Sequence, residues 1–216
     1  EAGVPYPGYS YENVWLKITP TSGSGELMSY GATANNVTND PAVHIAAQAA
    51  DIGGYNSPAS YQVIPEVLWA PATGGGTWMT EVQITDITGG SEVSVYFNAS
   101  TGDRRGPIAL FTGSGPGVSG RAGNLLNILG QLDPGYDYYS KVGTVEFVTQ
   151  DADHKIHVIA RTANGNYAKT FQGLNLNEAN TASTDRTLMV QNLVNDSTYR
   201  TAFGGFNPTD NDVTVE

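Results

Sequence analysis

The chain of 216 residues contains no cysteine, which excludes disulfides, thiolate metal ligands and cysteine nucleophiles together. Basic residues are scarce as well: ten Lys and Arg stand against 21 Asp and Glu, a net charge of −11. Such a charge opposes phosphate backbones and anionic membrane surfaces, so nucleic acid is not an expected partner. No apolar run approaches the roughly 20 residues that a membrane-spanning helix needs, so no membrane span is expected.

Charged residues of either sign make up only 14% of the chain, whereas turn-forming residues are abundant, with 26 Gly and 11 Pro. Many short strands joined by tight turns need this composition. It predicts an all-β fold. Together with the Asn-x-Ser/Thr triplets that begin at Asn36, Asn98 and Asn195, it favours an extracellular or cell-surface protein.

Two stretches of the chain are echoed further along. Residues 27–36 resemble residues 156–165 at an offset of 129 positions, and residues 77–88 resemble residues 198–209 at an offset of 121. Internal repetition on this scale indicates one supersecondary unit used twice. The sequence therefore predicts two small β modules rather than one large domain.

Alternation of apolar and polar residues predicts the strands. The predicted ranges are 14–18, 26–34, 42–49, 61–69, 78–87, 91–98, 144–149, 155–163, 167–174, 186–194, 198–206 and 211–216. Gly89-Gly90 predicts a hairpin between the strands that flank it.

One short helix is predicted in the insert 99–143, the section that has no echo. Its apolar residues fall at positions i, i+3, i+4 and i+7, namely Leu125, Ile128, Leu129 and Leu132. Asn124 can cap its start, and Asp133-Pro134-Gly135 ends it.

The repeat also predicts the domain organisation. Residues 61–98 form what we call the front half of a module and residues 144–174 the back half, so that 61–175 is a complete module. The second module is built from 13–60 plus 176–216, and residues 1–12 form an extended Tyr/Pro-rich arm. Three alternatives follow: the terminal segments pair within one chain, they pair head-to-tail between neighbouring subunits, or the chain is a fragment of a longer tandem array.

The segment Thr77-Trp78-Met79-Thr80-Glu81-Val82, its echo from Thr198 to Pro208 and the stretch from Asn124 to Leu132 resemble tandem modules of large secreted bacterial surface proteins. Two departures from that pattern are Met79 in place of Arg and Asp86-Ile87 in place of Asn-Pro. The resemblance implies immunoglobulin-like β-sandwich modules with an architectural role. It implies no chemistry, because those modules are mostly functionally undescribed.

Catalytic candidates are weak. His154 and His157 lie on an expected turn and strand and converge poorly on a metal, and the remaining histidine is His44. The chain has no Gly-x-Ser-x-Gly elbow and no recognisable triad. The sequence therefore predicts no catalytic residue and no enzyme.

Calcium is the one cofactor that the sequence leaves open. Paired carboxylates in loops can hold Ca²⁺, but Asp also forms ordinary β-turns with its own backbone, which is the favoured interpretation. The candidate ligands are Asp151, Asp153, Asp210 and Asp212.

Aromatic residues suggest a sugar-binding platform. Tyr136, Tyr138 and Tyr139 follow the predicted helix, with Trp15, Trp69 and Trp78 on or beside strands, although core packing is the plainer interpretation. The basic residues Arg104, Arg105 and Arg121 are interpreted either as a contact for an acidic neighbouring subunit or as a solvated surface.

The sequence thus predicts a non-enzymatic extracellular structural protein, either a surface scaffold or the subunit of a head-to-tail filament that self-associates through its terminal half modules. The alternative is a carbohydrate-binding or adhesive module that uses the insert 99–143 to bind a glycan or cell-surface partner. The ligand and any glycosylation are not predicted.

Overall fold

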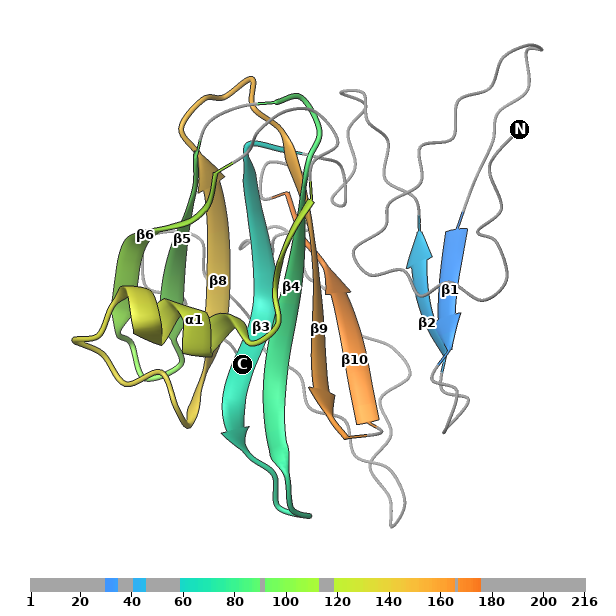
Figure 1. Cartoon of the computed structure of the whole chain (residues 1–216), viewed down its shortest axis with the longest axis vertical. Helices are drawn as coiled ribbons and strands as arrows, with labels where there is room; N and C mark the ends of the chain where they lie inside the picture. The colour runs from blue at the N-terminus through green and yellow to red at the C-terminus, as the bar shows by residue number, and fades with distance from the viewer. Residues whose placement is uncertain are drawn as a thin grey trace, which may run out of the picture.

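The computed structural model describes residues 59–89, 92–112, 119–165 and 167–175, together with the backbone of two short strands nearer the N-terminus. The described chain is mostly antiparallel β-sheet with one short helix, which confirms the all-β prediction (Figure 1). The elements are β1 (Tyr30–Ala34), β2 (Pro41–Ile45), β3 (Tyr61–Pro71), β4 (Thr77–Asp86), β5 (Glu92–Ala99), β6 (Arg104–Thr112), β7 (Ser119–Ala122), α1 (Leu125–Leu132), β8 (Lys141–Thr149), β9 (Ile156–Asn164) and β10 (Tyr167–Gln172).

The strands from β3 onward form one antiparallel sheet in the order β10-β9-β4-β3-β8-β5-β6, with β7 beside β4. β3 and β4 pair only at 69–71, next to the turn that joins them. Away from that turn, the edge of β4 that faced β3 pairs with β7 instead. At the other end of β3, Val63 forms an isolated β-bridge with Leu174, just beyond β10. The sheet therefore has two parts, β6-β5-β8-β3 and β7-β4-β9-β10, which are joined at both ends of β3.

The front and back halves of the predicted module interlock within this sheet. The front-half strands β3 and β5 both pair with β8 of the back half, and β4 pairs with β9 of the back half. Within the front half, the only pairing among the described strands is the short contact between β3 and β4. The ladder hydrogen bonds of this region thus run mainly between the halves, and a half without its counterpart would leave them unmade.

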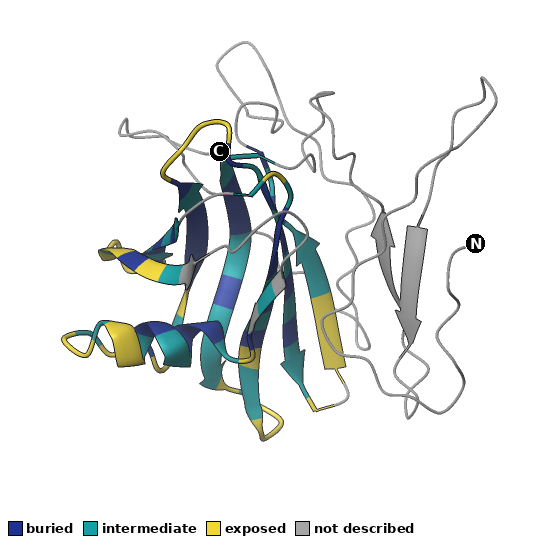
Figure 2. Cartoon of the chain, turned by 45° about the horizontal axis from the view of Figure 1, so that its top comes forward, coloured by how far each residue is buried: buried dark blue, intermediate teal, exposed yellow. Residues whose placement is uncertain are grey.

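One hydrophobic core connects both parts of the sheet with the helix (Figure 2). Its buried side chains come from every element between β3 and β9. In β5 the buried Val93, Val95 and Phe97 alternate with half-buried residues, as the sequence predicts for a strand.

Buried polar side chains complete the joints at the two ends of β3. At one joint, Thr80 Oγ1 accepts the Leu68 N–H at 2.9 Å and lies 2.8 Å from Thr162 Oγ1. At the other, Gln62 Oε1 accepts the Val158 N–H at 2.7 Å. Side-chain oxygens therefore satisfy buried N–H groups at the points where the backbones diverge.

The helix begins and ends where the sequence predicts. The Asn124 side chain accepts the Asn127 N–H at 3.2 Å, and the Asp133 N–H donates to Leu129 O at 2.8 Å. The inward face buries Leu125, Leu126 and Leu129. Leu132, which the periodicity assigns to the same face, is instead 52% exposed at the last turn.

The hairpin predicted at Gly89-Gly90 is wrong. β4 and β5, the strands on either side, are not neighbours in the sheet, because β4 pairs with β9, β7 and β3, whereas β5 pairs with β6 and β8. Gly89 has a positive φ of 82°, and its N–H donates to Asp86 Oδ1 at 2.8 Å. The glycine thus makes a turn, but the connection crosses from one part of the sheet to the other.

The insert 99–143 contains more than the predicted helix, since β6, β7 and the beginning of β8 also lie in it. β6 contains the cis Gly106-Pro107 bond. Its register with β5 shifts across that bond, between Ile108 and Arg105, and again between Ala109 and Phe111. Gly and Pro in this stretch interrupt the apolar alternation, so the strand carries no period-two pattern.

β1 and β2 form a separate antiparallel pair near β10 (Figure 1). β1 falls within the predicted strand 26–34, and β2 overlaps the predicted strand 42–49 but begins one residue earlier, at Pro41. The predicted arm 1–12 and the strands 14–18, 186–194, 198–206 and 211–216 lie outside the described residues.

Candidate functional site

Glu146 is a buried carboxylate on the face of β8 that points away from the core. Its chain neighbours Val145 and Phe147 are core residues, so alternation directs Glu146 to the opposite face, yet its side chain is only 6% exposed. The cover comes from β3, β5 and β6, which supply a tyrosine, an asparagine and an arginine. We call these four residues the Glu146 network: Tyr61, Asn98, Arg104 and Glu146.

The hydrogen bonds of the Glu146 network are short. The Tyr61 hydroxyl donates to Oε2 at 2.5 Å, and both Asn98 Nδ2 and Arg104 Nη1 donate to Oε1 at 2.6 Å. Arg104 also lies over the Tyr96 ring, 4.6 Å from its centroid. Because both carboxylate oxygens are engaged, Glu146 holds four strands together rather than offering a lone pair to a substrate.

Burial and the hydrogen bond to Glu146 raise the pKa of Tyr61. The phenol therefore remains a hydrogen-bond donor at neutral pH, which suits a hydrogen bond that links β3 to β8 better than it suits proton transfer.

Asp133, directly after α1, is the centre of a second network. Arg105 on β6 binds it through Nε and Nη2, each at 2.8 Å, and the Tyr138 hydroxyl donates to it at 3.0 Å. The hydrogen bond from Arg105 lowers the pKa of Asp133, while burial raises the pKa of Tyr138. This bidentate pair fixes the end of the helix to the edge of the sheet.

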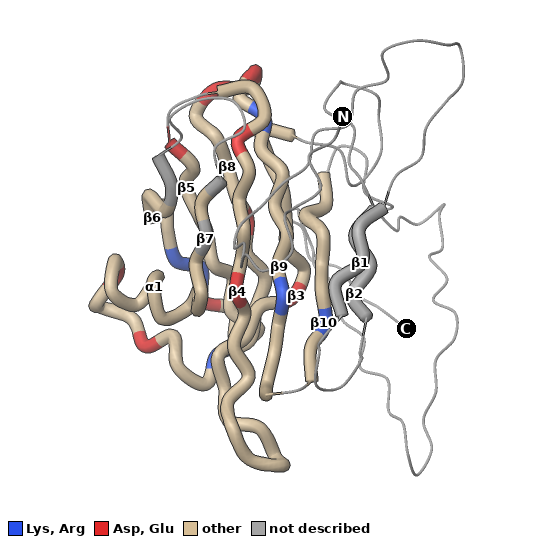
Figure 3. Tube along the Cα trace, turned by 45° about the vertical axis from the view of Figure 1, so that its right-hand side comes forward, with Lys and Arg blue, Asp and Glu red and all other residues tan. Residues whose placement is uncertain are grey.

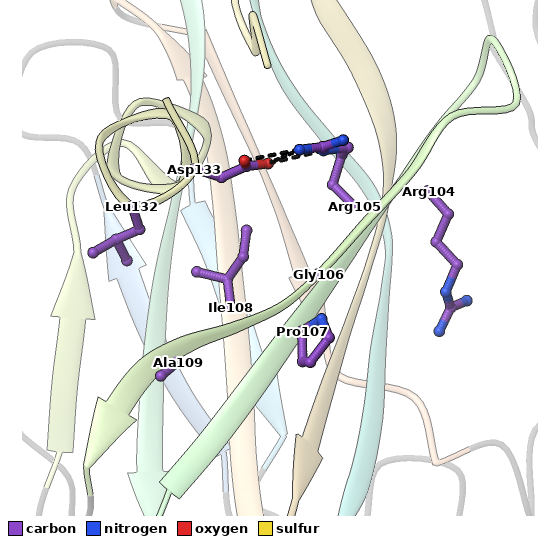
Figure 4. A pocket seen from close by; sticks show the side chains of 8 residues that line it. All are labelled: Arg104, Arg105, Gly106, Pro107, Ile108, Ala109, Leu132 and Asp133. Atoms are coloured by element: carbon purple, nitrogen blue, oxygen red, sulfur yellow. Dashed lines mark hydrogen bonds and ion pairs between the residues drawn. The ribbon is translucent and has the colours of Figure 1, made fainter. Parts of the chain in front are cut away.

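A groove of about 490 Å³ lies beside this pair. It is lined by residues 104–109 of β6 and by Leu132 and Asp133. Figure 4 shows Arg105 and Asp133 pointing toward one another, whereas Arg104 points away from them. Each arginine that lines the groove is paired with a carboxylate, so charge alone does not select a ligand for it.

The basic spot that the sequence leaves open as a subunit contact is thus largely used within the chain. Arg104 binds Glu146 and Arg105 binds Asp133, on the stretch of β6 that lies near α1 (Figure 3). The Arg121 side chain lies outside the described residues.

Asp86, the last residue of β4, and His154, in the turn that precedes β9, form a buried pair. His154 Nε2 lies 3.2 Å from Asp86 Oδ1, and the two side chains are 1% and 0% exposed. Their contact lacks hydrogen-bond geometry, and among the described residues Asp86 Oδ2 and His154 Nδ1 have no hydrogen-bond partner. His157 lies on β9, and the His44 side chain is not described.

The calcium candidates fall in two places. Asp151 and Asp153 are exposed in the turn before β9, where Asp151 Oδ1 accepts the Asp153 N–H at 2.9 Å, a turn that Asp makes with its own backbone. Asp210 and Asp212 lie outside the described residues. Within the described ranges no three His, Asp or Glu side chains are grouped to hold a metal ion.

The three tyrosines after the helix do not form one exposed platform. Tyr138 is 1% exposed and packs against Phe97 at 5.4 Å between ring centroids, while the Tyr136 hydroxyl donates to Asp103 at 3.0 Å. Only Tyr139 is well exposed, at 41%, with an edge-to-face contact to Trp69 at 5.1 Å.

Sequence reasoning missed Glu146 and Asp133 as centres of interaction. The signal for Glu146 was an acidic residue within the apolar run of β8, because a charge there needs partners. The N-x-Ser triplet at Asn98 also has a different role, since the Asn98 amide donates to Glu146 and accepts from Arg104.

Comparison of the chain with protein-family models, curated proteins and solved structures finds no match in any of the three. The resemblance to tandem bacterial surface modules therefore stays a prediction. α1, the helix of the described region, is too short to cross a membrane.

Proposed function

We propose that this chain is a non-enzymatic extracellular structural protein made of two immunoglobulin-like β-sandwich modules. Residues 61–175 form one module, and the segments 13–60 and 176–216 form the second. If the second module closes within one chain, the protein is a surface scaffold. If it closes between neighbouring chains, the protein is the subunit of a head-to-tail filament.

The interlocking of the two halves carries this proposal. In the described sheet, β4 of the front half and β9 of the back half pair along their whole common length, from Met79–Ala163 to Asp86–Ile156. These are the two strands that the sequence echoes, at 198–209 and 27–36. The two echoed segments thus resemble two strands that are hydrogen-bonded partners. A strand that lacks its partner leaves an open edge, and open edges favour pairing with another strand.

The polar networks support a structural role. The Glu146 network joins β3, β5, β6 and β8, and Asp133 joins the end of α1 to β6. Their donors and acceptors are used on one another, which rigidifies a fold. Composition and the Asn-x-Ser/Thr triplets support the extracellular placement.

Limited proteolysis and light scattering of the full chain test the proposal together. We expect residues 13–50 and 186–216 to be protected from protease at a level close to that of the described sheet. A monomer at every concentration would then support the scaffold, and growth with concentration would support the filament. Rapid removal of both segments from a monomer contradicts the proposal.

A second candidate function is glycan binding, favoured by the exposed Tyr139 ring edge-on to Trp69. A glycan array tests it with the wild type, Tyr139→Ala and the matched control Tyr167→Ala, which removes a 71% exposed tyrosine on β10. Binding that only Tyr139→Ala abolishes supports this function. The absence of binding by the wild type removes it.

A further inference from the structure

β1 has an edge that corresponds to a paired edge in the described module. β1 pairs with β2, the strand that follows it, just as β9 pairs with the following β10. β9 also pairs with β4 along its other edge, whereas among the described residues β1 pairs with β2 alone. A strand edge of this kind is a template for another strand.

We propose that residues 198–209 of the same chain add to β1 as an antiparallel strand, with Ala202 opposite Ala32. This inference deepens the proposed function and rests on it. The register is that of β4 on β9, transferred through the two sequence echoes. Residues 198–209 lie outside the described residues, and three pairs of residue types that the transferred register brings together support it.

The first matched position is a pair of threonines. Thr80 and Thr162 are buried in the described sheet, with their hydroxyl oxygens 2.8 Å apart. The transferred register sets Thr201 opposite Thr33, so both members of the hydroxyl pair are kept.

At the second position, both members of an ion pair are replaced by uncharged residues in the echoed segments. Glu81 and Arg161 are opposite one another in the described sheet, with Arg161 Nη1 3.3 Å from Glu81 Oε1. Their counterparts are Ala202 and Ala32. The transferred register thus leaves neither charge without its partner.

At the third position, a larger side chain on one strand is matched by a smaller residue on the other. Val82 faces Ala160 in the described sheet, and the counterparts are Phe203 and Gly31. The larger side chain is again opposite the smaller one, and an aromatic ring that covers a cross-strand glycine is a stabilising arrangement in sheets.

The chain itself can supply this strand. Residues 176–197 separate the end of the described region from residue 198 and can span up to about 75 Å when extended. β2, the partner of β1, lies near β10, where the described region ends. A tethered segment also acts at an effective concentration in the millimolar range, which favours its own chain over a second copy.

The absence of cysteine makes disulfide trapping a clean test. Directly opposite residues have Cα atoms about 4.5 to 5.5 Å apart, within disulfide range, while diagonal neighbours are about 7 to 8 Å apart. The test variant is Ala32→Cys with Ala202→Cys, and the matched control is Ala34→Cys with Ala202→Cys. Glu81→Cys with Arg161→Cys, in the known register, is the positive control.

We expect the test variant to form an intrachain disulfide with a yield on the order of tenfold above the control, independent of protein concentration. Circular dichroism identical to the wild type confirms that the fold is kept. Equal yields in test and control overturn the register. Links formed only when an Ala32→Cys chain is mixed with an Ala202→Cys chain overturn the assignment to the same chain.

The proteolysis experiment separates this inference from the proposed function. If neither double variant forms a link but both terminal segments are protected, the strand pairing is wrong and the proposed function stands. If the segments are also unprotected, both fail.

Discussion

Two buried carboxylates in this fold have opposite surroundings. Glu146 receives hydrogen bonds from three side chains, on β3, β5 and β6, at 2.5 to 2.6 Å. Asp86 accepts one backbone N–H, from Gly89, and contacts His154 without hydrogen-bond geometry. Equal burial therefore does not mean equal contribution to stability, because the contribution depends on how fully the buried group is satisfied.

The same chemical change at the two sites sharpens this comparison. Glu146→Gln replaces an oxygen acceptor with an NH₂ group that faces existing donors, so we expect the free energy of unfolding to fall by about 2 to 3 kcal/mol. Urea denaturation at neutral pH measures the loss. A loss below that of the Asp86 variant would reverse our ranking of the two sites.

Asp86→Asn should lower the free energy of unfolding by less, about 1 kcal/mol or below, since the amide oxygen can still accept the Gly89 N–H and no well-formed hydrogen bond to His154 is lost. The same urea denaturation measures this loss.

Double-mutant cycles extend the comparison to the partners of the two carboxylates. We expect a larger coupling between Glu146 and Tyr61 than between Asp86 and His154. The opposite order would show that the His154 contact is the stronger interaction.

The smallest expected effect on stability is limited to acidic pH. The pKa of Asp133 is lowered from its usual 3.8, chiefly by the hydrogen bond from Arg105. A carboxyl with a depressed folded-state pKa stabilises the fold above about pH 3.8, and this stabilisation is lost as pH falls through the lower value. In Asp133→Asn the thermal midpoint should therefore fall less steeply below pH 4 than in the wild type. Parallel curves for the two proteins would contradict this prediction.

The helix and most strands of the described region could be predicted because their signals are local. Asn124, the leucine periodicity and Asp133-Pro134 act within a few residues of one another, and the structure confirms the helix they predict. Strand β5 is similar, because alternate residues along one strand face the core.

The missed features depend on residues far apart in the chain. Gly89-Gly90 indicates a turn, but β9 is the long neighbour of β4 and lies about seventy residues later. Arg104 and Glu146 are 42 positions apart and meet only because β6, β5 and β8 are neighbours in the sheet. No local pattern specifies which distant strand becomes a neighbour.

The sequence by itself determined the all-β class, the helix α1 and the echo between distant strands, because periodicity and capping act over short separations. Only the tertiary structure decided that the front and back halves interlock and that Glu146 is covered by three strands. Strand order is set by the packing of the whole core, in which apolar faces from every strand between β3 and β9 are buried together. That order in turn gives the sequence echo its physical meaning, since the echoed strands β4 and β9 are hydrogen-bonded partners.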